Sequence, residues 1–371
     1  MTGFPTDPTV VAFDGGPLLG PLTGIGLAVE QTLASLRSRD DVAMRPYALS
    51  FRGHLPESTT RLPLPAMVAH RLWGRMNHPH VDHWLRPAQV VHGTNYVVPP
   101  SRLPRLVTVY DCWFLRNPAQ AVGDVARAGR VMRRAVAAGA MVHASSHATA
   151  DAVRELLGTD RVEVVHLAAL APDGSAPMAA APIAELCDVP FIVSIGTLER
   201  RKNIPRLVRA FGQLAPTHPT LCLVLAGADG DDRGAIDDAI DELPNGVNVR
   251  VIRTGRIDTA AKRWLLDNAR ALAYASLDEG FGFPLLEAMQ HDLPVVASTR
   301  GSIPEVAGNA ALLVDADDTD ALAGALETAI ADESARTVLI AQGRLRLDAF
   351  SWADTARSLT GLYHRLAEEG T

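Results

Sequence analysis

The sequence predicts an α/β protein with two doubly wound domains. Short apolar runs alternate with helical patterns along the chain, as they do where helices cover both faces of a parallel sheet. The 371 residues suffice for two domains that each have a core of their own. We expect these domains at residues 1–170 and 190–350, with a linker at residues 171–189 that begins in an Ala- and Pro-rich stretch.

Composition excludes several classes of protein. The net charge of −7 argues against bulk nucleic-acid binding, which requires a basic surface. No run approaches the roughly 18 apolar residues of a membrane span, and the first residues do not resemble a secretion signal. The three cysteines, Cys112, Cys187 and Cys222, are odd in number and widely spaced. We therefore expect reduced thiols in a cytoplasmic protein.

Polar residues follow the predicted strands of the first half. These strands are expected at residues 9–13, 89–92, 106–110 and 140–144, and residues 162–167 close the first domain. Ligands of open parallel sheets gather at the carboxyl ends of strands, so His92, Asn95, Tyr110 and Asp111 are candidates for substrate contact. A structural role is the alternative for a single histidine such as His92.

A glycine-rich loop follows the first strand and precedes a helical pattern at residues 27–36. Gly24 and Gly26 could let the backbone approach a diphosphate closely, as in dinucleotide-binding folds. The spacing does not match G-x-G-x-x-G, so an ordinary turn is the alternative.

Residues 52–86 interrupt the α/β alternation. They contain many Arg, His and Pro residues together with Trp73 and Trp84. Such a segment can lie on a membrane surface or bind a bulky acceptor. The alternative is an irregular insertion whose tryptophans pack inward.

A basic loop follows the first strand of the second half. Strands are expected there at residues 191–195, 221–226, 247–252 and 271–275, and helices at residues 318–331 and 351–366. Arg200, Arg201 and Lys202 are consecutive, and a shared anionic ligand would relieve their mutual repulsion. Lys202 and Lys262 are the only lysines among 35 basic residues. The alternative is an exposed basic turn.

The pattern of residues 276–289 predicts a second anion site. This segment follows the strand predicted at residues 271–275 and reads as a loop and a helix. Pro284 suits the first helical turn, where its missing N–H would have no partner. Phe283 would then be the N-cap, and an apolar side chain leaves the first amides to another acceptor. Gly280 and Gly282 let the backbone approach a ligand. Phosphate is the expected ligand.

Two carboxylates, Glu279 and Glu287, bracket this loop. Carboxylates repel phosphate but accept hydrogen bonds from hydroxyl groups, so a diphosphate with a sugar on each side would fit. The alternatives are a solvated Glu279 and a Glu287 that stabilises the helix dipole. The acidic residues 229–232 could suggest a metal site, but we interpret them as a solvated turn.

These motifs resemble those of a known family. The segment EGFGFPLLEAM, residues 279–289, is similar to the E-x7-E motif of the retaining GT-B glycosyltransferases of family 4, the glycosyl transferases group 1 and their mannosyltransferase-like members. The similarity continues at residues 194–211, 293–298 and 303–318. It implies two Rossmann-like domains that face a central cleft. The first would be the acceptor side and the second would bind a nucleotide sugar, with the final helix, residues 351–371, packed back on the first.

The resemblance also implies roles for individual residues. The catalytic candidates are Glu279, Arg201, Lys202, Tyr110, Asp111 and His92. Residues expected to bind the donor are Gly24, Gly26, Gly196, Arg201, Lys202, Arg256, Glu279, Gly280, Phe281, Gly282, Phe283, Leu285 and Glu287. Related enzymes often carry His where this chain has Tyr110, and His92 is a candidate substitute for it.

The implied reaction is retaining transfer of a hexose, with mannose favoured, from a nucleoside-diphosphate sugar to a glycan, a lipid-linked acceptor or another hydroxyl acceptor. GDP-mannose is the favoured donor, with UDP-sugars as the alternative, and no metal or other cofactor is expected. A cytoplasmic location with peripheral contact at the inner face of the membrane would suit such an enzyme. The alternatives are a nucleotide-sugar epimerase, a glycosyl phosphorylase and a non-catalytic protein that binds sugar nucleotides.

Overall fold

The computed structural model describes residues 7–20, 22–49, 58–121, 123–170 and 188–370, together with residues 181, 183 and 186. The chain divides into two compact units. The first comprises Met1–Ala168 and Phe350–Thr371, and the second comprises Ala169–Ala349. Most of the predicted linker, together with Cys187 and residues 52–57 of the predicted insertion, lies outside the described residues.

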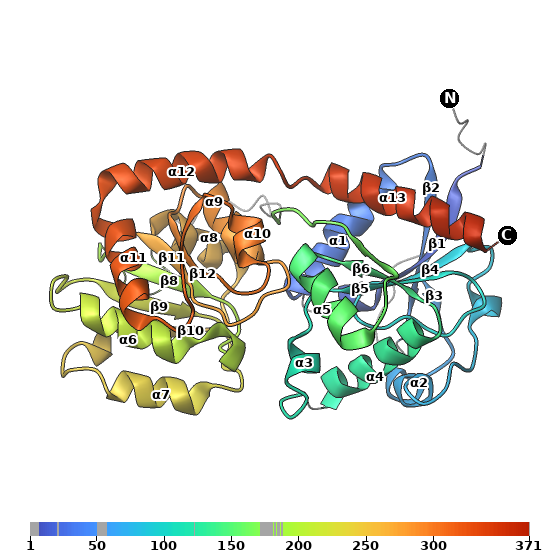
Figure 1. The fold of residues 1–371 in the computed structure, drawn as a ribbon, viewed down its shortest axis with the longest axis horizontal. Helices are drawn as coiled ribbons and strands as arrows, with labels where there is room; N and C mark the ends of the chain where they lie inside the picture. The colour runs from blue at the N-terminus through green and yellow to red at the C-terminus, as the bar shows by residue number, and fades with distance from the viewer. Residues whose placement is uncertain are drawn as a thin grey trace. The chain divides into compact units, whose positions relative to one another are not determined.

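The first unit contains a parallel seven-stranded sheet in the order β3-β2-β1-β4-β5-β6-β7 (Figure 1). Its strands are β1 (Thr9–Asp14), β2 (Val42–Ala48), β3 (Thr60–Arg61), β4 (Val90–Gly93), β5 (Arg105–Val109), β6 (Met141–Ala144) and β7 (Val162–Val164). The side chains of these strands are mostly buried, which explains why continuous apolar runs predicted most of them.

Helices cover both faces of this sheet. One face packs against α1 (Gly24–Arg37) and α13 (Trp352–Glu369). The other packs against α2 (Ala66–Trp73), α4 (Gly123–Ala137) and α5 (His147–Leu157). The short elements are η1 (Gly16–Leu18), η2 (Asp82–Trp84) and α3 (Trp113–Arg116). The final helix therefore belongs to the first unit, although the whole second unit precedes it in the chain.

A buried polar chain joins α13 to the sheet. The hydroxyl of Tyr363 lies 2.7 Å from Nδ1 of His92, whose Nε2 lies 2.8 Å from Oγ1 of Thr108. That hydroxyl lies 2.9 Å from Nδ1 of His143, and Nε2 of His143 donates to the carbonyl of Val165. Since Val165 can only accept, each hydroxyl donates to a neutral imidazole nitrogen. Burial lowers the pKa of both histidines, consistent with neutral rings.

The second unit contains a parallel six-stranded sheet in the order β10-β9-β8-β11-β12-β13. Its strands are β8 (Phe191–Ile195), β9 (Cys222–Ala226), β10 (Val251–Gly255), β11 (Ala271–Tyr274), β12 (Val295–Ser298) and β13 (Ala311–Val314). Both sheets confirm the predicted doubly wound α/β class.

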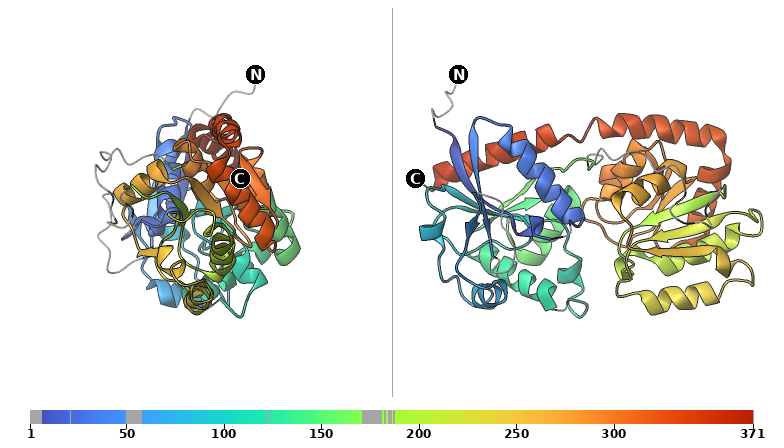
Figure 2. Two further views of the ribbon diagram at one scale, coloured as in Figure 1. Left: turned by 90° about the vertical axis from the view of Figure 1, so that its left-hand side faces the viewer. Right: turned by 180° about the vertical axis from the view of Figure 1, so that it is seen from behind.

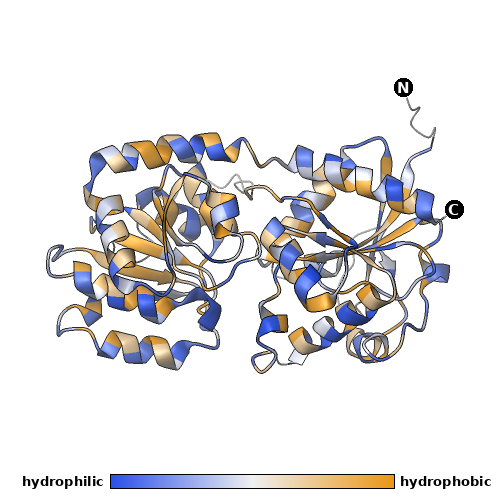
Figure 3. Ribbon diagram, in the orientation of Figure 1, coloured by the Kyte–Doolittle hydropathy of each residue, from blue (hydrophilic) through white to orange (hydrophobic). Residues whose placement is uncertain are grey.

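Helices also cover both faces of the second sheet (Figure 2). One core packs the sheet against α6 (Ile204–Leu214), α7 (Arg233–Asp241) and α11 (Thr319–Ala331). The other helices are α8 (Thr259–Asn268), α9 (Phe283–Gln290), α10 (Ile303–Ala307) and α12 (Glu333–Leu347), with the short η4 (Arg200–Lys202) and η5 (Asn248–Arg250). Figure 3 shows apolar strands inside each unit and polar outer surfaces on many helices.

Each sheet has one position at which the direction of strand addition reverses. In the first unit it lies between β1 and β4, and in the second between β8 and β11. Loops that leave adjacent strands in opposite directions open a crevice at the carboxyl edge of such a sheet, which favours ligand binding there. No helix in the described part of the chain is long and apolar enough to cross a membrane.

Candidate functional site

Close backbone contacts shape the loop that follows β8 in the second unit. Gly196 has a φ of +139°, a backbone angle that residues with a side chain rarely adopt. A Cβ atom on Gly227, after β9, would lie 2.0 Å from the carbonyl oxygen of Gly196. The two glycines therefore let these neighbouring loops touch and fix the start of the basic segment.

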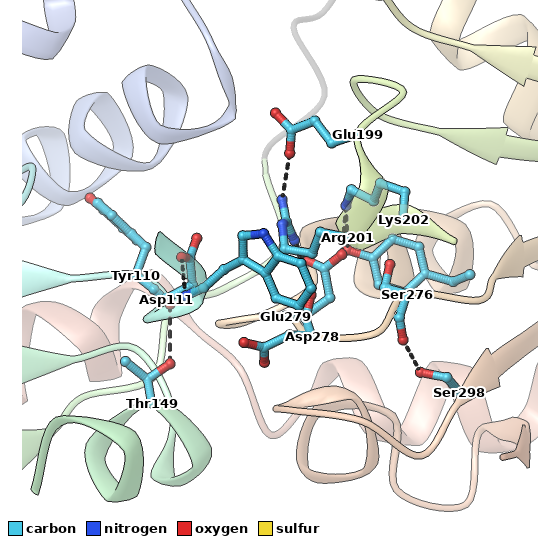
Figure 4. Close-up of polar contacts among 12 residues, drawn as sticks. Tyr110, Asp111, Thr149, Glu199, Arg201, Lys202, Ser276, Asp278, Glu279 and Ser298 are labelled. Carbon is cyan, nitrogen blue, oxygen red and sulfur yellow. Dashed lines mark hydrogen bonds and ion pairs between the residues drawn. The ribbon is translucent and has the colours of Figure 1, made fainter. Parts of the chain in front are cut away.

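A buried ion-pair cluster lies at the end of this loop. Nζ of Lys202 lies 2.6 Å from Oε1 of Glu279, and a guanidinium nitrogen of Arg201 lies 2.5 Å from Oε2 (Figure 4). The Glu279 side chain is only 7% exposed. Burial alone would raise the pKa of Glu279, but the charges of Arg201 and Lys202 outweigh it and lower the pKa to about 2. The carboxylate is therefore ionised and fixed in position.

The predicted basic loop and the predicted glutamate thus meet in one place. The loops after β8 and β11 are also joined through the backbone, because the amide of Leu277 donates to the carbonyl of Arg201 over 2.7 Å. Tyr274 at the end of β11 adds a hydroxyl 3.2 Å from Nζ of Lys202. Burial and then the charge of Glu279 raise the pKa of Tyr274 well above its ordinary value, so this phenol is neutral.

The acidic segment 229–232 supports the basic loop, and our prediction of a solvated turn was wrong for part of it. Asp231 accepts a hydrogen bond from the amide of Arg200 over 2.9 Å. Asp232 is buried, and its carboxylate lies 4.0 Å from Nε of Arg200. The missing signal was the pairing of the loops after β8 and β9, which sequence spacing does not reveal.

The start of α9 differs from the prediction by one residue. Its N-cap is Gly282, not Phe283, and Gly282 has a φ of +95° and makes no side-chain cap. Glycine is favoured there because other residues are strained at this φ. Pro284 has no N–H and the amide of Leu285 donates to Gly282, so the helix start offers fewer amides to an anion than we expected. Gly280 and Phe281 are buried, and the ring of Phe281 packs edge-on against that of Phe283.

Glu287, one turn into α9, is paired with Lys262 of α8. Glu287 is buried, as are its neighbours Leu285, Leu286 and Ala288. Lys262 was not among the residues expected at the site, although the rarity of lysine in this arginine-rich chain was a signal. Arg256, one of the residues expected to bind the donor, is exposed just after β10, which lies two strands from β8.

In the first unit, Tyr110 and Asp111 lie at the carboxyl edge as predicted, just after β5. The Tyr110 side chain is buried, and its carbonyl accepts hydrogen bonds from Ser145 and Thr149. Asp111 accepts from the amide of Trp113 over 3.1 Å. His92 lies below this edge in the core, where both ring nitrogens are bonded to Tyr363 and Thr108. The geometry therefore supports the structural role of His92 and not the substrate contact.

Gly24 and Gly26 form the first turn of α1, where we expected a loop. Thr23 caps this helix, and its hydroxyl accepts from the amide of Gly26 over 3.3 Å. A Cβ atom on Gly26 would lie 2.9 Å from the carbonyl of Pro17, so glycine permits close packing of the preceding segment. The packing explains Gly26 without a ligand.

Two further polar groups lie at the edge between β1 and β4. Asp14 was not among the predicted site residues, whereas Asn95 was a candidate for substrate contact. Asp14 accepts a hydrogen bond from the amide of Gly16 over 2.9 Å, and burial raises its pKa to about 7. Oδ1 of Asn95 is buried and has no partner among the described residues. The signal for Asp14 was its position directly after the strand predicted at residues 9–13.

Comparison with known proteins identifies the family. Residues 183–346 match the profile of the glycosyl transferases group 1. The alpha-maltose-1-phosphate synthase of Mycolicibacterium smegmatis is 31% identical over 71% of this chain and 74% of that protein. The chain is a group 1 glycosyl transferase. The O-antigen chain mannosyltransferase B of Escherichia coli is 28% identical to this glycosyl transferase over 96% of the chain and 100% of the relative.

Solved structures share the fold of this glycosyl transferase. A sucrose-phosphate synthase from Thermosynechococcus elongatus superimposes with a TM-score of 0.73 at 21% identity, covering 96% of this chain and 99% of that one. WaaG, a glycosyltransferase involved in lipopolysaccharide biosynthesis, gives a TM-score of 0.65 at 16% identity over 96% and 99%. The predicted GT-B architecture and hexosyltransferase class are confirmed.

Proposed function

We propose that this glycosyl transferase moves a hexose, with mannose preferred, from a nucleoside-diphosphate sugar to a hydroxyl of a glycan or lipid-linked acceptor, with retention of configuration. The main support is the meeting of Arg201, Lys202 and Glu279 at the strand-order reversal of the second unit. Mannose is favoured because the relative that aligns over 96% of the chain is named a mannosyltransferase. A Serotype-specific mannosyltransferase WbdA of Escherichia coli is also similar, at 29% identity over 179 residues.

The ion-pair cluster suits the departure of a diphosphate. Arg201 and Lys202 place two positive charges beside the buried charge of Glu279, while the second carboxylate near Arg201, that of Glu199 at 3.4 Å, is 42% exposed and more strongly screened by solvent. Fixed positive charge stabilises the negative charge that develops as the bond from sugar to phosphate breaks. Glu279 has about four lone-pair sites, and those not used by the two cations accept hydrogen bonds from sugar hydroxyls.

The acceptor binds the first unit in this proposal, at the edge that carries Tyr110 and Asp111. The leaving phosphate takes the proton of the attacking hydroxyl on the same face of the sugar. His92 has no part in this step, because both of its ring nitrogens are already bonded. Tyr110 then takes the position near the transferred sugar that a histidine often occupies in related enzymes.

The reaction requires no metal or other cofactor in this proposal, because Arg201 and Lys202 supply the positive charge for the diphosphate. Transfer should therefore proceed at an unchanged rate in the presence of a chelator. A loss of activity with EDTA that Mg²⁺ or Mn²⁺ restores would contradict this part.

We place the enzyme in the cytoplasm, with peripheral contact at the inner face of the membrane. The predicted insertion supports this in part. Trp73 is buried, whereas Met67, Val68 and Trp84 are exposed in a segment that also exposes Arg71. The protein should co-sediment with anionic vesicles at low salt. If the same amount of protein sediments without vesicles, the membrane contact is contradicted.

Nucleotide binding is tested by thermal unfolding in the presence of GDP, UDP, ADP and their sugar conjugates. A ligand at about 100 times its dissociation constant stabilises a protein by roughly 2.7 kcal/mol. We expect GDP and GDP-mannose to raise the unfolding temperature more than the other nucleotides do. No increase with any of them would contradict the proposed function.

A second assay separates transfer from the alternatives on the same fold. We expect the enzyme to release the nucleoside diphosphate only when a hydroxyl acceptor is present. An epimerase would convert the donor without an acceptor, a phosphorylase would require free phosphate, and a binding protein would show no turnover over a broad acceptor panel.

A further inference from the structure

A buried phenol lies at the basic loop of the second unit. Tyr274 is the last residue of β11 and is only 2% exposed. A Cβ atom on Gly282 would lie 3.8 Å from Cε1 of Tyr274, so the ring packs against the start of α9. A phenylalanine would fill the same space without the cost of burying a hydroxyl. Packing alone therefore does not explain the phenol.

The partner of this phenol is the ammonium group of Lys202. The phenol oxygen accepts a hydrogen bond from Nζ over 3.2 Å, and Nζ lies 4.7 Å from the centroid of the ring. Burial and then the charge of Glu279 raise the pKa of Tyr274 well above its ordinary value, so the phenol stays neutral. Tyr274 therefore binds Lys202 without adding a negative charge that would offset the charge of the lysine.

The ammonium group of Lys202 has three N–H donors, and two of them have partners. One donates to Oε1 of Glu279 over 2.6 Å, and the other donates to the phenol of Tyr274. No partner of the third is found in the part of the chain that the structure describes. The Lys202 side chain is only 12% exposed, so little water can reach this donor. The third N–H is therefore left for an anionic ligand.

Two acceptors together fix the direction of the third donor. With Glu279 alone, the ammonium could turn about the bond from Cε to Nζ. With Glu279 and Tyr274 in place, the tetrahedral geometry at Nζ sets where the third N–H points. Gly196 keeps a side chain away from this group, because a Cβ atom there would lie 3.3 Å from Cε and 3.6 Å from Nζ. A donor that is already oriented loses less freedom when a ligand binds.

We infer that Tyr274 is a positioning residue of the diphosphate site, whose hydroxyl and Glu279 together hold the ammonium of Lys202 so that its third N–H points at the diphosphate of the donor nucleotide. The inference rests on the proposed function, because it requires a nucleoside diphosphate at Lys202. It explains why a buried position carries a phenol. It also explains why the second acceptor is neutral, since another carboxylate would repel the diphosphate.

Isothermal titration calorimetry with GDP, UDP and ADP tests the role of the hydroxyl. Tyr274→Phe keeps the ring and its packing but removes the second acceptor of Lys202. The dissociation constant of the nucleotide that the wild type binds most tightly should rise roughly tenfold, as for the loss of a hydrogen bond to a charged group. Tyr363→Phe is the matched control, because Tyr363 is a fully buried phenol of the first unit that is bonded to His92. It should keep the wild-type dissociation constant.

A double-mutant cycle separates positioning of Lys202 from a merely structural role of Tyr274. In Lys202→Met the ammonium is absent, so the addition of Tyr274→Phe should change the dissociation constant by less than about twofold. If Tyr274→Phe weakens binding as much in this variant as in the wild type, its role is structural and the inference is overturned. Wild-type affinity of the single variant Tyr274→Phe would overturn it as well.

The same titrations distinguish failure of the inference from failure of the proposed function. If the wild type binds none of the three nucleotides, the proposed function fails and the inference fails with it. If the wild type binds a nucleoside diphosphate but Tyr274→Phe binds it equally well, only the inference fails.

Discussion

Glu279 is held by two cations at once, and this arrangement prepares the site before any ligand arrives. Its carboxylate lies within 2.6 Å of both Arg201 and Lys202, and all three side chains are mostly buried. Removing one partner would leave a buried charge without compensation, which costs about 3–5 kcal/mol in comparable pairs. The cluster therefore contributes to the geometry of the site as well as to its charge.

The partly buried carboxyl group of Asp14 makes the stability of the protein depend on pH. Burial raises its pKa from 3.8 to about 7, so between these values the folded protein binds a proton that the unfolded chain releases. The stability that this proton contributes is complete below pH 3.8 and is lost as the pH rises through about 7. Asp14→Asn removes this titration. Its unfolding temperature should fall less than that of the wild type between pH 5 and pH 8.

Thermal unfolding at the two pH values checks this prediction. Asp151→Asn is a suitable control, since Asp151 forms an exposed ion pair with Arg154 in the same unit. If the wild type and Asp14→Asn lose the same amount of stability between pH 5 and pH 8, Asp14 does not hold its proton in the folded state.

At the scale of elements, the loop after β12 supports the site through Gly301. This glycine has a φ of +56°, and a Cβ atom on it would lie 2.6 Å from both the amide nitrogen and the carbonyl oxygen of Glu279. Gly301→Ala must therefore move the backbone of Glu279. Gly246→Ala is the matched control, because Gly246 also has a positive φ, +84°, but has nothing within 4 Å of the added atom.

Both alanine variants should lose roughly 1–2 kcal/mol through backbone strain. Only Gly301→Ala should also bind the nucleoside diphosphate more weakly, by tenfold or more. Urea denaturation and calorimetric titration measure the two effects separately. Equal nucleotide affinities of the two variants would contradict a supporting role of Gly301.

Sequence patterns predicted the elements whose signals are local. The predicted bounds of β8, residues 191–195, agree with the structure at both ends. The strand predicted at residues 271–275 is β11, which ends one residue earlier, at Tyr274. β2 was missed because Arg45 and Pro46 interrupt its apolar pattern. Proline is tolerated there since β3, which has only two residues, pairs with Tyr47 and Ala48 and leaves Pro46 at an open edge.

Contacts between distant segments could not be predicted in the same way. The sequence indicated that Lys202 and Glu279 share a ligand, but not that they bind each other. The polar chain through His92 and Tyr363 joins residues 271 positions apart, and no local pattern reveals it. The same holds for Lys262, whose partner lies 25 positions away on another helix.

At the scale of the whole chain, the two units use one topological plan. In each, the first strand of the unit, β1 or β8, lies at the strand-order reversal, and polar residues follow it at the carboxyl edge. The second unit carries the cations and the first carries carboxyl and hydroxyl groups. This division matches a reaction in which one unit binds an anionic donor and the other binds a neutral acceptor.

We propose that the cluster of Arg201, Lys202 and Glu279 performs sugar transfer. The most direct measurement is turnover of a nucleoside-diphosphate sugar with an acceptor by the wild type, Lys202→Met and the control Arg209→Met, whose exposed ion pair with Glu242 lies on α6 of the same unit. We expect Lys202→Met to lose roughly 10²- to 10³-fold in kcat, as when one group that stabilises developing charge is removed. Arg209→Met should keep the wild-type rate. Full turnover by Lys202→Met would contradict the role of this cluster in sugar transfer.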